Sequence, residues 1–274
     1  MRFFHTFNSI PMVTINRWGK KNKLEFNIKL AKASAISIKQ VYPEAELVLY
    51  CNKDILDRFT STNDRKYYDN IYILQKEYNS EHLWAYSKIE ALEREPIGSI
   101  GIDTDIIFNI DNKDSLDSIL SCSKDCDVFF QNLELPYVED WYFIKPILGQ
   151  FIPKDLGLSC GIIRINNINL KKSYLSNYYS LISNLKEKEK EILERKKEAV
   201  VLGKSLCLDL IFEQALLYYL IKKDKYSYKT VFKNFIDDRT TNLLEKGLPL
   251  GYEHYYYLHK YTKLCEDRVK NILK

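Results

Sequence analysis

The sequence predicts an α/β protein with a mostly parallel central sheet flanked by helices, followed by a helical elaboration toward the C-terminus. Three observations predict it. Over the first 110 residues, short apolar stretches alternate with longer stretches of helical periodicity. That alternation is typical of a doubly wound sheet. From about 170 to 225 the pattern is mainly helical, and no linker or internal repeat divides the chain. We therefore expect one domain spanning residues 1–274.

The first half supplies strands and helices in strict alternation. Apolar stretches at 1–7, 45–52, 70–75 and 96–109 predict strands. The stretch 22–43 predicts a helix that ends before Pro43, and shorter helices are expected over 54–61 and 80–95. Asp54 and Ser80 stand where these two helices begin, so each is expected to cap its helix.

The second half has a different character. Strands are expected over 125–132 and 157–167, separated by a long loop over 133–155 that is rich in aromatic residues and proline. A long loop inside a compact domain is often functional. The final segment, 251–274, is expected to begin as a strand or loop and to end as a helix.

Charge and composition exclude several classes of protein. The net charge of +4 arises from 41 basic and 37 acidic side chains, which is too balanced for a dedicated nucleic-acid binder. It is compatible with an anionic small substrate, or with peripheral attachment to an acidic membrane surface. No apolar run approaches the roughly 18 residues of a membrane span, and the N-terminus does not resemble a signal peptide. We expect a cytoplasmic protein, peripheral at most at the inner face of a membrane, whose six scattered cysteines are free thiols.

The stretch GIDTDIIF, residues 101–108, places Asp103 and Asp105 inside an otherwise apolar strand. Residues i and i+2 of a strand point to one face, so the two carboxylates are expected to project together. They follow three αβ units, and ligands of open α/β sheets bind at the carboxyl ends of strands where the order reverses. Paired carboxylates repel unless a cation lies between them, and hard divalent cations prefer oxygen ligands. The sequence therefore predicts a metal site that holds a phosphorylated substrate.

Spacing alone is weak evidence, because a D-x-D pair is expected about once by chance in a chain of this composition. A second such pair, Asp125 and Asp127, follows a polar stretch and is expected to be a solvated turn that enters a strand.

With its neighbours, the acidic pair resembles a known family. The stretch HLWAYSKIEALEREPIGSIGIDTDIIF (82–108), SCGIIRINN (159–167) and YLHKYTK (257–263) together resemble the metal-dependent glycosyltransferases of the GT-A fold, which use nucleotide sugars. The order of elements agrees over most of the chain, whereas the sharp motifs cover only about thirty residues. The resemblance implies that residues 1–110 form a nucleotide-binding half, and that 111–274 form an acceptor-side half with the C-terminal helices.

The resemblance implies a donor site built around Mn²⁺ or Mg²⁺ and a nucleotide-diphosphate sugar, with a UDP-sugar favoured. Asp105 is implied to bind the metal directly, and Asp103 to face the ribose and the metal. His259 is implied as the third ligand, with His254 as its rival. Lys263, four residues after His259, would neutralise the leaving diphosphate.

The remaining donor contacts are also implied by the resemblance. Lys88 would reach the nucleotide unless it is an ordinary surface lysine, and Gly161 would lie beside the donor sugar. The first strand is implied to lie beneath the base, where the candidates are Thr6, Phe7 and Asn8.

Two mechanisms stay open. An inverting enzyme needs a carboxylate base, for which Glu139 and Asp140 in the long loop are candidates, with Tyr137 and Trp141 as stacking surfaces. In a retaining, glycogenin-like enzyme the pair Glu213 and Gln214 would lie near the donor sugar, although that family has Asp where this chain has Glu. Retention is the favoured outcome, with a glycan or lipid-linked acceptor and a role in building a bacterial surface polysaccharide.

Rival interpretations are weighed against this one. A haloacid-dehalogenase-like phosphohydrolase would use Asp103 as nucleophile and Asp105 as acid/base, with Asp237 and Asp238 as late metal ligands. That motif normally opens its domain, whereas about a hundred residues precede it here. Nucleotidylyltransferases need a glycine-rich loop after the first strand. Residues 8–20, which follow the first strand here, contain a single glycine, Gly19, so this class is discounted. A non-catalytic sugar-binding descendant is the remaining alternative.

Overall fold

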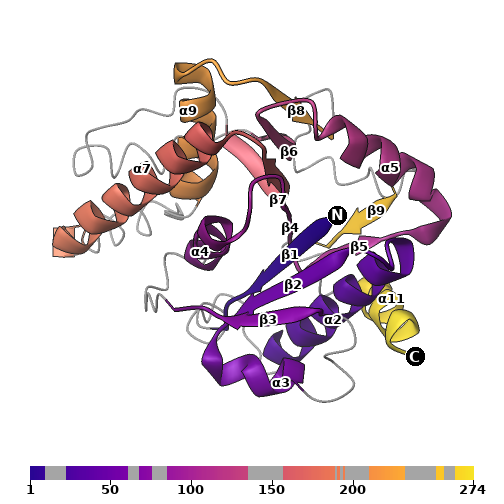
Figure 1. Ribbon diagram of the computed structural model, residues 1–274. Helices are drawn as coiled ribbons and strands as arrows, with labels where there is room; N and C mark the ends of the chain where they lie inside the picture. The colour runs from indigo at the N-terminus through magenta and orange to yellow at the C-terminus, as the bar shows by residue number, and fades with distance from the viewer. Residues whose placement is uncertain are drawn as a thin grey trace.

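The computed structural model describes a layered α/β domain in residues 1–9, 23–60, 68–75, 85–134, 157–188, 190–191, 194, 210–231, 251–255 and 263–274. Its main sheet has seven strands in the order β3-β2-β1-β4-β7-β6-β8 (Figure 1). In chain order these strands are β1 (Arg2–Phe7), β2 (Glu46–Cys51), β3 (Asn70–Ile73), β4 (Ile100–Ile102), β6 (Val128–Glu134), β7 (Gly157–Ile165) and β8 (Tyr228–Thr230).

Most neighbouring strands of this sheet are parallel. The pairs β1–β2, β2–β3, β1–β4 and β6–β8 are parallel, whereas β7 runs antiparallel to both β4 and β6. The chain builds outward from β1 to β3 and then returns to place β4 on the other side of β1. The order therefore reverses between β1 and β4. The predicted mostly parallel α/β sheet is confirmed, and its antiparallel strand comes from the second half of the chain.

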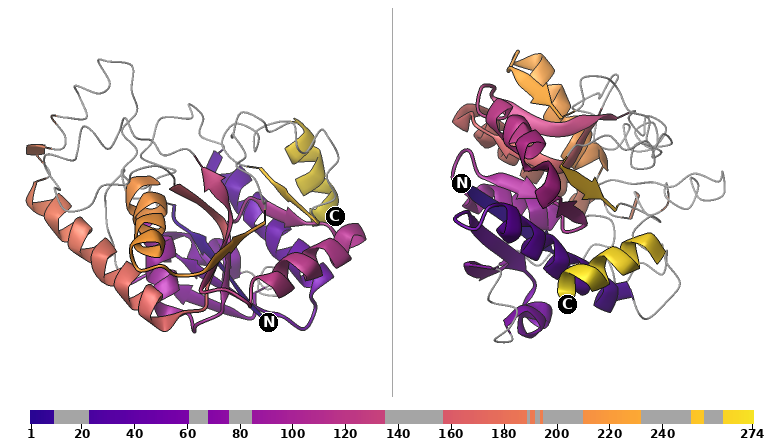
Figure 2. Two further views of the ribbon diagram at one scale, coloured as in Figure 1. Left: turned by 90° about the horizontal axis from the view of Figure 1, so that it is seen from above. Right: turned by 90° about the vertical axis from the view of Figure 1, so that its right-hand side faces the viewer.

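Helices cover both faces of the sheet. The helices α4 (Tyr86–Arg94), α7 (Ile168–Glu187) and α9 (Leu216–Lys223) lie on one face (Figure 1). The helices α2 (Lys23–Val41) and α5 (Lys113–Cys122) lie on the other. Helix α11 (Lys263–Leu273) lies beside α2, as both views of Figure 2 show. None of the helices in the described part of the chain is both long enough and apolar enough to cross a bilayer.

The strand sequences explain this two-sided burial. In β1, Phe3 and Phe7 pack on the side of α2, whereas Phe4 between them packs on the side of α4. In β2, Leu47 and Leu49 likewise face α2. Successive side chains of a strand point to opposite faces, so a strand covered on both faces is apolar throughout.

The predicted strand over 96–109 is two strands in two sheets, which corrects the sequence interpretation. Strand β4 ends at Ile102, the chain turns through Asp103–Asp105, and β5 (Ile106–Phe108) pairs antiparallel with β9 (Tyr252–His254) in a separate two-stranded sheet. Ile102 and Ile106 are both buried, so the apolar pattern continues across the break and does not reveal it. Asp103 and Asp105 therefore converge through a turn and not through the pleat of one strand.

Smaller differences have local causes. Asp54 does not cap a helix. It lies within the 3₁₀ turn η2 (Lys53–Ile55) that precedes α3 (Leu56–Thr60), and it accepts a hydrogen bond of 2.7 Å from the hydroxyl of Ser9. Ser80 lies outside the described residues, where α4 is described only from Tyr86. Two elements were not predicted from the sequence, helix α5 and strand β8. Helix α5 follows the 3₁₀ turn η3 (Ile110–Asn112), and its mixed polarity gives no clear helical pattern.

The acidic turn before β6 is as predicted. Asp127 accepts hydrogen bonds from the backbone N–H and hydroxyl of Ser227 and from the amide of Asn167, at 2.7 to 2.8 Å. These neutral donors lower the pKa of its carboxyl, so the second D-x-D pair is a structural turn. The described cysteines, Cys51, Cys122, Cys126, Cys160 and Cys265, are free thiols as expected.

Candidate metal centre and its buried lysine

The turn Asp103–Asp105 lies at the place where the strand order reverses. Strands β1 and β4 are adjacent and parallel, with Phe4 opposite Gly101, and β4 ends one residue after that pair. The backbone N–H of Asp103 donates to the carbonyl of Gly161 on β7 at 2.8 Å. Both aspartates are thus fixed at the carboxyl end of the central strands, the position where open α/β sheets bind ligands.

Three potential metal ligands meet at this turn. Asp103, Asp105 and His254 each offer one ligand atom, and these atoms lie within 4.8 Å of one another. Nε2 of His254 lies 3.3 Å from Oδ1 of Asp105. Asp105 is buried at 9% exposure, whereas the side chain of Asp103 is 29% exposed, so the cluster is open on the Asp103 side.

The two-stranded sheet of β5 and β9 positions His254 beside the two aspartates. In the β5–β9 ladder Ile106 is opposite His254, and the backbone N–H of Tyr255 donates to the carbonyl of Asp105 at 2.8 Å. Gly251 begins this segment with φ +80°, and a Cβ there would lie 2.6 Å from the side chain of Leu116. Only glycine adopts that conformation readily in so tight a space, so Gly251 sets the direction in which β9 approaches β5.

Gly161 provides room for the histidine. A Cβ on Gly161 would lie 2.4 Å from Oε1 of Gln131 and 2.8 Å from Cε1 of His254. Any side chain at this position would therefore displace the imidazole or the amide. Gly161 was predicted beside a donor sugar. In the structure it borders the Asp–Asp–His cluster, and its role toward a sugar stays a prediction.

Lys88, on α4, contacts this cluster through Asp103. Its ammonium lies 2.7 Å from Asp103 Oδ1 and 3.0 Å from Glu213 Oε1, and it donates to the carbonyl of Cys160 at 3.2 Å. Lys88 is buried at 7% exposure, so it is not an ordinary surface lysine. Burial alone would lower the pKa of its ammonium, but the carboxylates of Asp103 and Glu213 outweigh burial and raise that pKa.

Glu213 reaches Lys88 from the π-helix η4 (Leu210–Ala215), which leads into α9. It is 1% exposed. Burial raises the pKa of its carboxyl, and the negative charge of Asp103 adds to this effect, while Lys88 opposes both. A π-turn inside a helix often marks a functional site. Gln214, its predicted partner, is half-buried, and no contact between Gln214 and the cluster is described.

The base-contacting candidates lie at the end of β1. The side chain of Phe7 is 1% exposed and packs edge-on against Phe59, with 5.4 Å between the ring centroids, so this side chain is part of the core and only the backbone of Phe7 is left for a contact with a base. Thr6 and Asn8 are half-buried. Their predicted contacts with a base stay a prediction.

Seven of the residues named from the sequence fall outside the described part of the chain. They are His259, the favoured third ligand, Asp140 and Glu139, the candidate bases, Tyr137 and Trp141, the candidate stacking surfaces, and Asp237 and Asp238, the late acidic pair of the hydrolase alternative. Lys263 is the exposed first residue of α11, and among the described residues no contact joins it to the two aspartates. Its predicted role at a diphosphate stays a prediction.

Two residues near the cluster were missed by sequence reasoning. His5 is fully buried on β1, where Tyr68 contacts its Nδ1 at 3.0 Å, and burial lowers the pKa of its imidazole to about 3. Gln131 on β6 contacts Nδ1 of His254 at 3.0 Å. A glutamine within an apolar strand, VFFQN, was the available signal, because a buried amide needs partners.

The donor set suits a divalent cation. Three carboxylates, those of Asp103, Asp105 and Glu213, face the single ammonium of Lys88, which leaves an excess of negative charge even with Glu213 protonated. Two carboxylates and an imidazole are ligands that Mn²⁺ accepts and Mg²⁺ accepts in part. The residues present therefore fit such an ion.

Comparison with known proteins gives similarities of fold. No family model matches this sequence, and no curated protein matches it. The galactosyltransferase LgtC, solved with donor and acceptor sugar analogues, is 12% identical, with a TM-score of 0.49 over 99% of this chain and 95% of that chain. The inositol-1-phosphate CTP transferase from T. maritima is also 12% identical, with a TM-score of 0.49 over 100% and 96% of the two chains.

Mouse xyloside xylosyltransferase 1, in its apo form, is 11% identical, with a TM-score of 0.41 over 84% of both chains. These neighbours are two glycosyltransferases and a nucleotidyltransferase, and at such scores the likeness is one of outline alone. The chain is thus an α/β protein, similar in outline to these transferases, with an Asp–Asp–His cluster where its strand order reverses.

Proposed function

We propose that this protein is a glycosyltransferase that moves a sugar from a nucleotide-diphosphate sugar to an acceptor, with Mn²⁺ or Mg²⁺ as cofactor. One observation carries the proposal: Asp103, Asp105 and His254 meet within 4.8 Å at the switch point of the sheet. Ligands bind there in open α/β sheets, and carboxylate-bound divalent cations commonly share coordination with substrate phosphates.

Asp103, Asp105 and His254 would hold the cation, with Asp105 as the buried ligand. Bound there, a divalent cation supplies positive charge that stabilises a diphosphate leaving group. Lys88 acts through Asp103: its ammonium fixes one carboxylate oxygen at 2.7 Å and leaves the other oxygen for a ligand. This is a positioning role, because Lys88 is buried and its charge is already shared between two carboxylates.

Glu213 supports the retaining form of the reaction. Glu213 and Asp103 both form ion pairs with the ammonium of Lys88. The buried carboxylate of Glu213 is therefore close to the end of the sheet at which ligands are expected to bind. A carboxylate near the donor sugar can stabilise the positive charge that develops on the anomeric carbon. An inverting reaction would instead use a base such as Asp140. We favour retention, a UDP-hexose donor, and a glycan or lipid-linked acceptor in polysaccharide synthesis, with peripheral membrane attachment as a further expectation.

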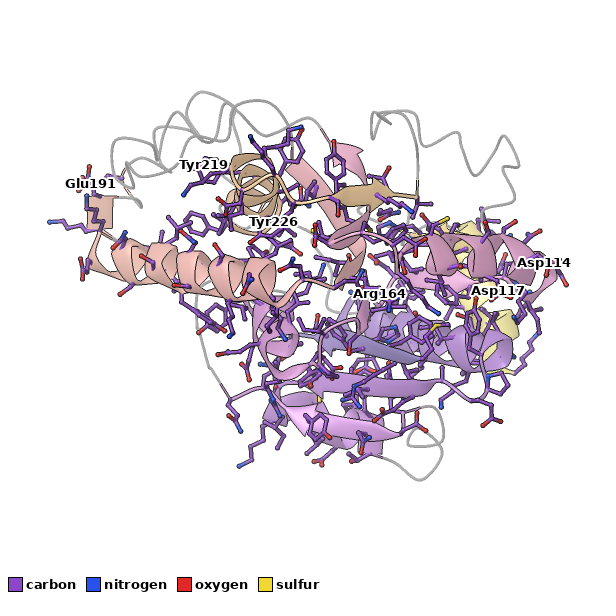
Figure 3. The ribbon with its side chains drawn as sticks, turned by 45° about the horizontal axis from the view of Figure 1, so that its top comes forward. Asp114, Asp117, Arg164, Glu191, Tyr219 and Tyr226 are labelled. Atoms are coloured by element: carbon purple, nitrogen blue, oxygen red, sulfur yellow. The ribbon has the colours of Figure 1, made fainter. Side chains whose placement is uncertain are left out.

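Thermal shift with matched ligands tests the proposal. Melting temperature should rise with UDP and Mn²⁺ together, and hardly with either alone, because each ligand completes the site of the other. Asp105→Asn should abolish the joint rise. Asp114→Asn is the control, since Asp114 is exposed on the outer end of α5 (Figure 3). No joint rise with any nucleoside diphosphate would contradict the proposal.

Product analysis separates the rival activities. A screen of sugar nucleotides without acceptor should release free sugar and nucleoside diphosphate in a Mn²⁺-dependent way. The configuration of the sugar transferred to an acceptor, read by NMR, decides between retention and inversion. Release of inorganic phosphate from phosphorylated substrates, with no requirement for a nucleotide, would instead favour a phosphohydrolase. Pyrophosphate release from a nucleoside triphosphate and a sugar phosphate would favour a nucleotidyltransferase.

A further inference from the structure

Behind the Asp–Asp–His cluster, two buried polar side chains, those of Ser159 and Gln131, form a hydrogen-bonded chain that ends at His254. Ser159 on β7 donates its hydroxyl to Oε1 of Gln131 on β6 at 3.2 Å. Nε2 of Gln131 donates to Nδ1 of His254 at 3.0 Å. Gln131 is 6% exposed and Ser159 is 7% exposed, so water competes little for these bonds.

In this orientation the amide of Gln131 selects one tautomer of His254. The NH₂ group of an amide is only a donor, so Nδ1 of His254 must be an acceptor and carries no proton. In the neutral imidazole the proton then lies on Nε2, the atom that faces Asp105 Oδ1 at 3.3 Å. A protonated Nε2 has no lone pair and cannot bind a metal.

Nε2 is nevertheless the atom that faces the carboxylates, because Nδ1 is turned toward Gln131. Metal binding through Nε2 places the proton of the neutral ring on Nδ1, and metal-ligating histidines almost always donate that proton to a partner. Gln131 can meet this requirement if its amide turns over, so that Oε1 accepts from Nδ1–H and NH₂ donates to Ser159. The hydroxyl of Ser159 can donate or accept, so it satisfies both amide orientations.

We propose that Gln131 and Ser159 form a reversible hydrogen-bond relay that sets the tautomer of His254 and thereby couples the amide orientation of Gln131 to binding of a divalent cation. The exchange moves one proton from Nε2 to Nδ1 of His254 and leaves the number of bound protons unchanged. Gln131 is a positioning residue in this scheme. The inference rests on the proposed function, because it assumes that the Asp–Asp–His cluster holds a cation.

Gly161 supports the relay independently. A Cβ at this position would overlap Oε1 of Gln131 at 2.4 Å and Cε1 of His254 at 2.8 Å. The backbone of β7 is therefore bare at the point where the amide and the imidazole meet. Such close approach is a common reason for glycine within a strand.

Cation affinity gives the first test. Mn²⁺ binding to the full chain is titrated by calorimetry for wild type, Gln131→Met and Ser159→Ala. Gln131→Met removes the acceptor for Nδ1–H and should weaken binding about 10- to 100-fold, the usual effect of losing such a partner. Ser159→Ala removes the partner of the amide and not of His254, so it should weaken binding less than Gln131→Met does, and an equal or larger loss would refute Gln131 as the direct partner of His254. Gln40→Met, at an exposed position of α2, is the matched control.

The tautomer itself gives the second test, which a purely structural role would not move. In ¹⁵N-labelled protein, long-range ¹H–¹⁵N spectra distinguish Nδ1–H from Nε2–H, and His254→Gln assigns the signal among the chain's four histidines. Wild type should show Nε2–H without cation and Nδ1–H with diamagnetic Zn²⁺. Gln131→Glu, whose carboxylate only accepts, should show Nδ1–H even without cation.

The outcomes separate the two proposals. If wild type binds Mn²⁺ and Gln131→Met binds it equally well, the relay is refuted and the proposed function stands. A cation-free wild type with Nδ1–H, or Gln131→Glu with Nε2–H, also refutes the relay alone. If wild type binds no divalent cation in the presence of nucleoside diphosphates, both the cation site and the relay are refuted.

Discussion

Replacing Lys88 by methionine tests the electrostatics of the site directly. Methionine keeps most of the alkyl volume and removes the ammonium that lies 2.7 Å from Asp103 and 3.0 Å from Glu213. At an effective dielectric constant of about 20, each contact contributes on the order of 5 kcal/mol of Coulomb attraction, most of which offsets desolvation. Removing one partner of such a buried pair costs about 3–5 kcal/mol, because the other charge stays buried.

The loss should arise mainly at Glu213. Its side chain is 1% exposed and gains no water when Lys88 is removed, whereas Asp103 is 29% exposed and is solvated in part. Lys88→Met should therefore lower the free energy of unfolding by about 3–5 kcal/mol at pH 8, and adding Glu213→Gln should restore most of it. Urea unfolding followed by circular dichroism measures both. A single-variant loss below about 1 kcal/mol, or a double variant no better than the single one, would refute this reasoning.

Two further predictions concern geometry and pH. Gly161→Ala should weaken Mn²⁺ binding at least tenfold, because the added Cβ overlaps the position of His254. Calorimetry measures the affinity, and circular dichroism checks that the variant is folded. Unchanged affinity in a folded variant would contradict the packing argument. The pH prediction concerns Glu95, which is 2% exposed and accepts hydrogen bonds of 2.6 and 2.8 Å from Arg2. Burial alone would raise the pKa of the Glu95 carboxyl. The hydrogen bonds outweigh burial and lower this pKa below its ordinary value of 4.5. The stabilisation is therefore fully present above about pH 4.5 and is lost as the pH falls through the lowered value. The urea midpoint of the wild type should fall over this acid range, whereas the midpoint of Glu95→Gln should lack this dependence; equal pH dependence of the two would contradict the argument.

Away from the site, other polar contacts tie the layers together. Arg164 on β7, labelled in Figure 3, donates to the hydroxyl of Ser123 at 2.9 Å. The hydroxyl of Tyr42 donates to Asp117 on α5 at 2.8 Å. These bonds hold α5 against the sheet and α2. They explain why a helix with few apolar positions is nevertheless ordered, and why its sequence alone did not predict it.

Of the two tyrosines labelled in Figure 3, Tyr219 lies within α9 and Tyr226 follows that helix, and both are near α7. Both are only partly buried and pack against the core on the α4 side. Together with the buried Tyr50, Tyr174 and Tyr178, they show that several of the 21 tyrosines serve in packing.

Much of the fold could be predicted from periodicity. Strands β1 and β2 and helix α2 agree with the expected ranges within a few residues. Each is packed against neighbouring elements, and the pattern of apolar residues in each segment indicates which side chains are buried. The break between β4 and β5 could not be predicted. Both pieces are apolar, and only pairing with β9, nearly 150 residues later in the chain, separates them.

The candidate site was predicted only in part. Asp103, Asp105, Lys88 and Glu213 were named from the sequence, and the structure brings all four together. The choice between two histidines could not be made in advance, because GYEHYYYLHKYTK has no periodicity that sets which one faces the aspartates. The ladder of β5 and β9 puts His254 there, and His259 lies outside the described residues.

The sequence by itself determined the layered α/β order and the acidic pair at a strand end, because local burial and spacing are properties of short segments. Only the tertiary structure decided what surrounds that pair. It buries Lys88 between two carboxylates, brings His254 in through a second sheet, and places Gln131 behind the imidazole. Each of these contacts joins residues at least 15 positions apart, so no local pattern predicts which residues meet.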